Sequence, residues 1–363
     1  MAGSDSTLEL RAAGNAFRLI EAWLLERGFF APGGEELEAD LYLGYGLSQT
    51  IRRGGTTLPE EPCPALPLAA CAVRPDPYVV ENDNHNGIRV GDWVGDWRAA
   101  DYGAAVERVR AAIARGDVYQ VNLVQHLSAS FSGAPAALAA KFASLSPLHP
   151  DPFVGEKWVI VSASPELFLA RRGRRVWTMP IKGTRPLGAA AELRASAKDA
   201  AEHIMIVDLE RNDLSRVCEP GTVRWPDLLE TRQLAGVEHM VSTVEGTLRE
   251  GVGLAEILEA TFPGGSVTGA PKIAAVDLIA ELEPVGRGAS MGALGRVYGN
   301  GDFDLALTIR TFAIAGGRIH LWVGGGVVWD SDPAAEVEES WTKARPLLEA
   351  LGSPLEALAE ERR

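Results

Sequence analysis

Residues 198–214 read KDAAEHIMIVDLERNDL, and this stretch gives the first expectation about the fold and its chemistry. The region from Ala195 to Leu209 predicts a helix. On that helix Asp199 and Glu202 are three residues apart, so both carboxylates lie on nearly one face. Such a pair suits a hard divalent cation, although an exposed, solvated helix face is the commoner explanation for one pair taken alone.

A second acidic pair lies near the other end of the chain. Glu336 and Glu339 are again three residues apart, on a helix predicted from Pro333 to Leu351 with Asp332 as its N-cap. If the two pairs come together, their four carboxylates form a site for Mg²⁺, which takes a few carboxylates plus water and substrate oxygens. The alternative is an exposed ion pair between Glu339 and Lys343, four residues further on.

Residues 179–186, MPIKGTRP, predict a strand that ends in a turn carrying cations. Gly183 permits backbone geometry that other residues avoid. Lys182 is a candidate nucleophile, but a lysine with its ordinary pKa of about 10.4 is almost fully protonated at pH 7. Reaching neutrality requires roughly 4–5 kcal/mol of differential stabilisation, from burial, a nearby metal or Arg185. A surface lysine in a loop is the alternative.

Two glycine-rich stretches are candidate anion sites. Residues 261–272, TFPGGSVTGAPK, precede a predicted helix and can present backbone N–H groups to an anion. The run Gly324 to Gly326 follows a predicted strand and permits close backbone approach, although glycine bends in sheets are as common as ligand sites. Glu166 and His239 are candidate acid or base groups, and each taken alone is more often structural.

The remaining periodicity gives a coarse outline of the fold. Helices are predicted at residues 19–25, 102–115 (ending at Gly116) and 272–282; strands at 41–43, 158–161, 176–179, 306–313 and 319–323; and a polar loop at 81–87. Because strands and helices do not alternate strictly, a simple doubly wound sheet is not expected.

Composition limits the classes of function. The chain has 363 residues and a formal net charge of -14, which disfavours nucleic acid as a partner. An anionic substrate therefore needs a local group of cations, metal or backbone N–H groups. No apolar run approaches a membrane-spanning length, and no signal peptide is visible. Cys63, Cys71 and Cys218 are expected to be reduced structural thiols in a cytoplasmic protein.

Taken together and in this order, the motifs resemble those of the chorismate-utilising enzymes, which include the anthranilate, aminodeoxychorismate, isochorismate and salicylate synthases. The matching stretches are GDVYQVNL (116–123), SASPELFL (162–169), PIKGTRP (180–186), KDAAEHIMIVDLERNDL (198–214), EHMVSTVEG (238–246), FPGGSVTGAPK (262–272), IRT (309–311), GGGVV (324–328) and DSDPAAEVEESWTKA (330–344). The resemblance implies an α/β (α+β) fold in which two packed β-sheets are flanked by helices. Residues 96–352 would form the chorismate-binding catalytic domain, 1–95 a shortened N-terminal region of the same fold, and 353–363 a C-terminal tail.

The resemblance also implies roles for single residues. The Mg²⁺ ligands would be Glu202 and Glu339, with Asp199 and Glu336 close behind. The substrate-binding groups would be Arg310, the backbone N–H groups of Ser266, Gly325 and Gly326, and the residues Thr184, Gln120 and Lys272. Glu166 looks like the general acid that protonates the departing ring hydroxyl, and His239 matches a histidine near that leaving group.

Two positions subdivide the family. Members that add water have a lysine where this chain has Gln120, so water addition is disfavoured here. Lys182 stands where anthranilate-type and isochorismate-type members have alanine, and it matches the aminodeoxychorismate synthase component I branch. There the lysine is thought to attack C2 of chorismate and expel the C4 hydroxyl, after which ammonia adds at C4 to give 4-amino-4-deoxychorismate. The ammonia would come from a separate glutamine amidotransferase subunit, since no glutaminase domain is recognisable in this chain.

Two alternatives remain open. Anthranilate synthase component I would make Lys182 a bystander. A non-catalytic paralogue is favoured by Ser290, which replaces a tyrosine found in many members, and by the short N-terminal region. Because that region helps to form a tryptophan pocket in some members, tryptophan inhibition is not expected.

Overall fold

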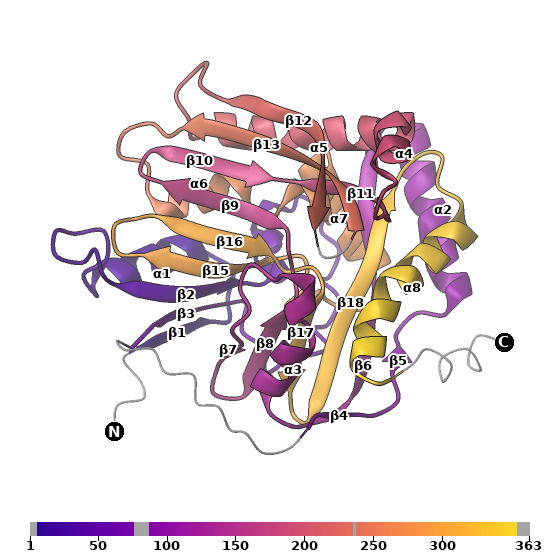
Figure 1. Ribbon diagram of the computed structural model, residues 1–363, viewed down its shortest axis with the longest axis horizontal. Helices are drawn as coiled ribbons and strands as arrows, with labels where there is room; N and C mark the ends of the chain where they lie inside the picture. Colours follow the sequence, from indigo (N-terminus) through magenta and orange to yellow (C-terminus); the bar gives the residue numbers. More distant parts are fainter. Residues whose placement is uncertain (1–5, 76–86, 235–236, 354–363) are drawn as a thin grey trace.

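The computed structural model describes residues 6–75, 87–234 and 237–353 (Figure 1). It contains two antiparallel β-sheets with helices around them, which confirms the predicted two-sheet fold. In Figure 1 the strands of the first sheet run across those of the second, which include the long strand β18. Of the polar loop predicted at 81–87, only Gly87 lies within the described ranges.

The first sheet takes strands from both ends of the chain. Its ten described strands, in order across the sheet, are β1 (Thr7–Leu10), β3 (Ala69–Val73), β2 (Glu38–Leu43), β15 (Ala293–Tyr298), β16 (Phe303–Leu307), β9 (Leu167–Arg172), β10 (Arg175–Met179), β13 (Val237–Thr247) and β11 (Ile181–Pro186), with β12 (Arg224–Leu234) also pairing with β13. The pairing of β2 with β15 therefore joins segments that are far apart in sequence.

The second sheet is built around two long strands. Its eight described strands are β14 (Gly269–Ala270), β6 (Gln120–Ser132), β18 (Arg318–Val327), β17 (Thr311–Ala315), β8 (Trp158–Ser162) and β7 (Phe153–Val154), with β4 (Arg89–Val90) and β5 (Val94–Gly95) pairing with β6. The β6–β18 ladder runs without interruption from Arg318 opposite Ser130 to Val327 opposite Val121. It fixes the position of the glycine run at 324–326.

The helices surround the two sheets, and several match the sequence predictions. Their bounds are α1 (Ala16–Leu25), α2 (Ala99–Arg115), α3 (Pro135–Lys141), α4 (Ala190–Ala195), α5 (Ala197–Ser215), α6 (Leu254–Thr261), α7 (Lys272–Leu282) and α8 (Pro333–Ala350), with short 3₁₀ turns η1 (Tyr45–Ile51), η2 (Ala143–Leu145) and η3 (Gly265–Val267). Helix α2 ends at Gly116 with φ of 81°, and the Asp332 side chain accepts the Ala335 N–H at the start of α8. Both predicted helix ends are therefore confirmed.

The main hydrophobic core lies between the sheets. It includes Leu41 and Leu294 of the first sheet together with Leu123 and Ile160 of the second, all nearly inaccessible to solvent. A second core packs the other face of the second sheet against α3 and α8, where Trp341 is a member. The three cysteines are buried free thiols, as expected.

One predicted strand is wrong. The sequence predicted a single strand over 306–313, but β16 ends at Leu307 and β17 begins at Thr311 in the other sheet. Residues 308–310, where the chain passes from the first sheet to the second, form the crossing between the sheets. Within it Arg310 has φ of 49°, a left-handed backbone conformation that is uncommon for residues other than glycine. Both strands are mostly apolar, and the residues between them, 308–310, include no glycine or proline that would mark the change of sheet.

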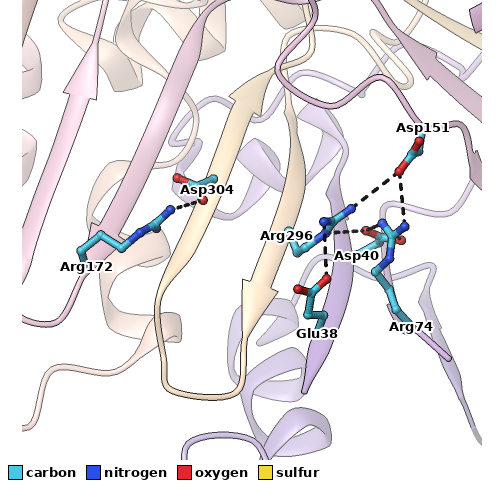
Figure 2. A network of polar contacts seen from close by, with 7 residues as sticks. All are labelled: Glu38, Asp40, Arg74, Asp151, Arg172, Arg296 and Asp304. Carbon is cyan, nitrogen blue, oxygen red and sulfur yellow. Dashed lines mark hydrogen bonds and ion pairs between the residues drawn. The ribbon is translucent and has the colours of Figure 1, made fainter. Parts of the chain in front are cut away.

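A network of ion pairs ties strands β2 and β15 to the segment before β7 (Figure 2). Arg74 contacts Asp40 at 2.9 Å and Asp151 at 3.3 Å, and Arg296 contacts Glu38, Asp40 and Asp151. A cavity of about 390 Å³ adjoins this network. None of the residues predicted to act on chorismate lines it.

Candidate active site

Lys182 is brought inward by an irregularity in β11. The pairing of β11 with β13 shifts register between Lys182 and Thr184. Gly183 between them has φ of 59°, and a Cβ there would lie 2.6 Å from a Leu193 methyl group, so glycine is needed. The side chain of Lys182 is 15% exposed, and its Nζ donates to the Ser266 carbonyl at 3.0 Å. Lys182 is therefore not the surface lysine of the alternative interpretation.

Glu166 lies just before β9 and is 5% exposed. Its Oε1 accepts hydrogen bonds from the Ser266 hydroxyl at 3.0 Å and from the Ile181 N–H at 3.4 Å. Burial raises the pKa of Glu166, while the nearby charges of Lys182 and Arg310 and the two hydrogen bonds oppose that rise. A carboxyl with a raised pKa keeps its proton to higher pH, as a general acid requires.

His239 on β13 pairs with Thr184, beside the same irregularity in β11. Its Nδ1 is 3.2 Å from the Gly183 carbonyl and 3.1 Å from the Thr184 hydroxyl. Burial lowers the pKa of His239, with the Gly183 carbonyl acting in the opposite direction. Its Nε2 is buried and has no protein partner among the described residues. A neutral imidazole that donates from Nδ1 to Gly183 has this second nitrogen available as an acceptor.

The candidate anion-binding groups come from separate elements of the fold. Ser266 lies in η3 and is buried, and Arg310 lies at the crossing between the sheets. Burial lowers the pKa of Arg310, and the charge of Glu166 opposes that change, so the two side chains are close enough to interact. Gly325 and Gly326 lie inside β18, where they pair with Leu123 and Asn122 of β6, so the glycine run continues the strand and the prediction that it follows the strand is wrong.

The predicted metal ligands approach the glycine run from two helices. A Cβ added to Gly325 would lie 3.1 Å from Glu339 Oε1 and 3.5 Å from Glu336 Oε2. A Cβ added to Gly326 would lie 3.1 Å from Glu202 Oε1. Helices α5 and α8 thus direct three carboxylates to neighbouring positions of one strand.

Each of these carboxylates has a polar partner. Glu202 Oε1 accepts from Gln120 Nε2 at 3.0 Å. Glu339 pairs with Lys343 at 2.8 Å, and both side chains are about half exposed, so the ion pair of the alternative interpretation is present. Burial raises the pKa of Glu336, which accepts from the Ser331 hydroxyl at 2.6 Å. Burial also acts to raise the pKa of Glu339, but the ammonium of Lys343 outweighs it and the net shift is downward.

The four predicted ligands meet only part of the coordination requirement of a hard cation. Oxygen ligands from Glu202, Glu336 and Glu339 are the type that Mg²⁺ prefers. In the described ranges, no three acidic, histidine or cysteine side chains by themselves form a metal-binding cluster. The fourth predicted ligand, Asp199, is held by Arg185 at 2.8 Å. If Mg²⁺ binds here, water and substrate oxygens would have to supply the remaining ligands, as is usual for this ion.

Two further predicted residues have defined surroundings. Gln120 is 1% exposed, and because its Nε2 donates to Glu202, its Oε1 is left as a buried acceptor without a protein partner in the described chain. Lys272 donates to Asp213 at 2.6 Å and to the Thr261 carbonyl at 2.8 Å. Both members of the Lys272–Asp213 pair are about nine-tenths buried, so Lys272 is part of a structural ion pair.

Besides Asp213, the partner of Lys272, sequence reasoning missed two buried ionisable residues on α5, His203 and Glu210. His203 is fully buried, and neither ring nitrogen has a described protein partner. Glu210 is 8% exposed. The signal was present in the helical period, because the buried stripe of α5 that contains Ile206, Val207 and Leu214 also contains Glu210.

Comparison with known proteins identifies the family of this chain. The sequence profile of the chorismate binding enzymes matches residues 69–349, which include all the predicted site residues. The chain belongs to the chorismate-binding enzyme family. Within that family it is 42% identical over 272 residues to anthranilate synthase component 1 of Streptomyces coelicolor, covering 71% of this chain and 53% of that protein. It is 39% identical over 272 residues to aminodeoxychorismate synthase component 1 of Escherichia coli K12, covering 72% and 59% respectively.

A solved structure supports the same assignment. Anthranilate synthase component I of Streptococcus pneumoniae superposes with a TM-score of 0.77 at 27% identity, covering 85% of this chain and 80% of that one. The matched region spans little more than half the length of the curated relatives. In the part of the chain that the structure describes, no helix combines the length and apolar character of a membrane span.

Proposed function

We propose that this chorismate-binding enzyme is an aminodeoxychorismate synthase component I. It would convert chorismate and ammonia to 4-amino-4-deoxychorismate, with the ammonia supplied by a partner glutamine amidotransferase. The observation that carries the proposal is the position of Lys182, enclosed between Ser266 and Glu202 and close enough to Glu166 to influence its ionisation. A lysine in that position can reach a bound ring as a nucleophile.

The proposed reaction uses the side chains in sequence. The neutral amine of Lys182 forms a bond to C2 of chorismate while the C4–O bond breaks. Glu166 gives its proton to the departing hydroxyl, which leaves as water. Ammonia then forms a bond to C4 as the C2–N bond to Lys182 breaks. The proton that the added ammonia gives up balances the proton that Glu166 supplied.

Two separate sets of groups would bind the two carboxylates of the substrate. Arg310, with the backbone N–H groups of Ser266, Gly325 and Gly326, would hold the enolpyruvyl carboxylate. Glu202 and Glu339, with Glu336 and Asp199 close behind, would hold Mg²⁺. When bound, Mg²⁺ would neutralise the ring carboxylate and fix its position. The ring substituents would be contacted by Thr184 on β11, His239 on β13 and Gln120 on β6, which surround Lys182 and its partner Glu202.

A product assay tests the proposal. Wild type, Lys182→Ala and the exposed-lysine control Lys141→Ala would each receive chorismate, Mg²⁺ and excess ammonium at mildly alkaline pH, with chromatography and mass detection. We expect wild type and Lys141→Ala to give an amino-substituted chorismate that keeps its enolpyruvyl group, and Lys182→Ala to give none. Release of pyruvate with anthranilate by wild type would contradict the assignment.

Anthranilate synthase component I is the second candidate, because relatives of that name are as similar to the chain as those named aminodeoxychorismate synthase component 1. In that case Lys182→Ala would still form product. A non-catalytic paralogue is the third candidate. It would show no turnover with ammonium or with any glutaminase partner. Ser290 by itself gives it little support, since its buried hydroxyl bonds to the Thr308 carbonyl at 3.3 Å.

A further inference from the structure

Glu210 is a buried carboxyl that the proposed reaction does not use. It lies on α5 and is 8% exposed. Its side chain accepts a hydrogen bond from the Thr178 hydroxyl at 3.3 Å. Leaving a carboxyl in such a place is costly unless it stays protonated or has an additional partner.

A small cavity adjoins this carboxyl. Its volume is about 10 Å³, close to the space that one water molecule needs. Thr178, Asp213 and Thr261 line it together with Glu210, so a water there has the two to four polar partners that buried waters require. The wall also includes Gly265, the residue before Ser266. Since the Ser266 hydroxyl donates to Glu166, the turn η3 borders the cavity through Gly265 and contacts the proposed general acid through Ser266.

The charges around the two carboxyls differ. Glu166 faces Lys182 from β11 and Arg310 from the crossing between the sheets. Glu210 faces Asp213 on its own helix and the Lys272 ammonium from α7, which is already hydrogen-bonded to Asp213. Burial raises the pKa of Glu210 well above its ordinary value, and the charge of an ionised Glu166 raises it further. Burial therefore favours the protonated form of both carboxyls, and the ionisation of either one opposes the ionisation of the other.

We propose that Glu210 is the proton reserve of Glu166, and that the two buried carboxyls share one proton as a coupled pair. The proposal rests on the proposed function, in which Glu166 protonates the C4 hydroxyl as it leaves. The carboxylate left on Glu166 then receives a proton from Glu210 through the Ser266 hydroxyl and a water in the cavity. The proton that ammonia releases after bonding to C4 restores Glu210. Glu210 acts through Glu166 and does not touch the substrate.

The first test observes the carboxyls without any substrate. Infrared difference spectroscopy follows the C=O stretch of protonated carboxyls during a pH titration of wild type, Glu210→Gln and Glu166→Gln. Glu256→Gln, on the exposed face of α6, is the control. Other buried carboxyls such as Glu61 and Glu336 also contribute bands, so the bands of interest are assigned by their absence from a variant. We expect wild type and the control to show one band that is missing in Glu166→Gln and another that is missing in Glu210→Gln, and to lose these two bands in separate steps. In Glu166→Gln the Glu210 band should disappear at least about one pH unit lower than in wild type, because its ionised neighbour is missing.

The second test is the pH dependence of kcat/KM. When one proton is shared, part of the enzyme keeps Glu166 protonated, so the alkaline limb of wild type should show a shoulder between the two ionisations. In Glu210→Gln, kcat/KM on the alkaline limb should fall tenfold per pH unit with no shoulder. Glu210→Asp keeps a carboxyl and should restore the shoulder. An equal loss of activity at every pH would overturn the proposal and make Glu210 structural. If no variant turns over chorismate, the proposed function fails and the infrared bands still decide the coupling.

Discussion

The Nζ of Lys182 lies 3.5 Å from Oε1 of Glu202, so the proposed nucleophile contacts a proposed metal ligand. Gln120 donates to the same oxygen. A divalent cation bound to Glu202 has to compete with the ammonium for this carboxylate. Metal binding and release of Lys182 from its ion pair are therefore expected to be linked, which leads to the first prediction.

Lys182→Met should bind Mg²⁺ more tightly than wild type. The substitution removes a competing and repelling cation while keeping an apolar side chain of similar length. A partly buried ion pair of this kind is worth about 1 kcal/mol, so the affinity should rise about fivefold. Calorimetric titration of Mg²⁺ in the presence of chorismate measures it, with Lys141→Met as control. An unchanged affinity would exclude Glu202 as a ligand that competes with Lys182.

Mg²⁺ and chorismate together should raise the thermal stability of wild type. At concentrations near 100 times the dissociation constant, the gain is about 2.7 kcal/mol. Glu339→Gln should lose most of this gain, because it removes a charged ligand. Its neighbour Glu338, which is exposed and pairs with Arg345, gives the matched control Glu338→Gln. Equal stabilisation of both variants in a thermal-shift assay would argue against Glu339 as a ligand.

Glu166→Gln should lower kcat/KM by about 10²–10⁴, the usual contribution of a general acid. Gln keeps the shape and can retain a hydrogen bond with Ser266, but it has no proton to give. Its melting temperature should therefore stay at or above that of wild type, since a buried ionisable group is removed. The measurement pairs steady-state kinetics with thermal denaturation. A loss of activity that parallels a loss of stability would point to misfolding instead.

Glu61 predicts a pH dependence of stability. Burial raises the pKa of Glu61 to about 7, although its carboxylate accepts the Gly288 N–H at 2.9 Å. Because the folded state holds this proton more tightly than the unfolded state, stability is greatest below the ordinary glutamate pKa. It falls as pH rises from about 4.5 to about 7, by about 3 kcal/mol at most.

Urea denaturation between pH 4 and 8 measures this change. The difference in unfolding free energy between wild type and Glu61→Gln should change across that window, in favour of the variant as pH rises. Its exposed neighbour gives the control Glu60→Gln, which should follow wild type at every pH. A constant difference between wild type and Glu61→Gln would show that Glu61 does not titrate in this range.

Local signals in the sequence correctly predicted the ends of helices that are marked by capping residues. The helix ending at Gly116 and the helix starting after Asp332 were confirmed, because a glycine C-cap and an N-cap with a following proline are short-range devices. The crossing at Arg310 was not predicted. Its left-handed backbone depends on which sheet each flanking strand joins, and that choice is made by partners distant in sequence.

The candidate site shows the same division. The helical period placed Glu336 and Glu339 together, and the resemblance supplied their roles. No local pattern could bring Lys182 within reach of Glu202 or leave Lys272 paired with Asp213, since those contacts depend on how β11, α5 and α7 pack. The helical period of α5 places Glu210 among its buried apolar residues. An acidic residue at such a position is easily assumed to lie at the solvent-exposed border of the apolar face.

The pairing of β2 with β15 has a consequence during synthesis of the chain. Leu41 pairs opposite Gly295, so strand β2 leaves the ribosome about 250 residues before its partner. At roughly 5–20 residues per second, its edge waits about 10–50 s for that partner to emerge. During this interval β1, β3 and β2 can form a small antiparallel unit in which the edge of β2 that later pairs with β15 is unpaired. A nascent chain of this fold should thus depend on chaperones until residues 293–307 have emerged and β15 and β16 can complete the sheet.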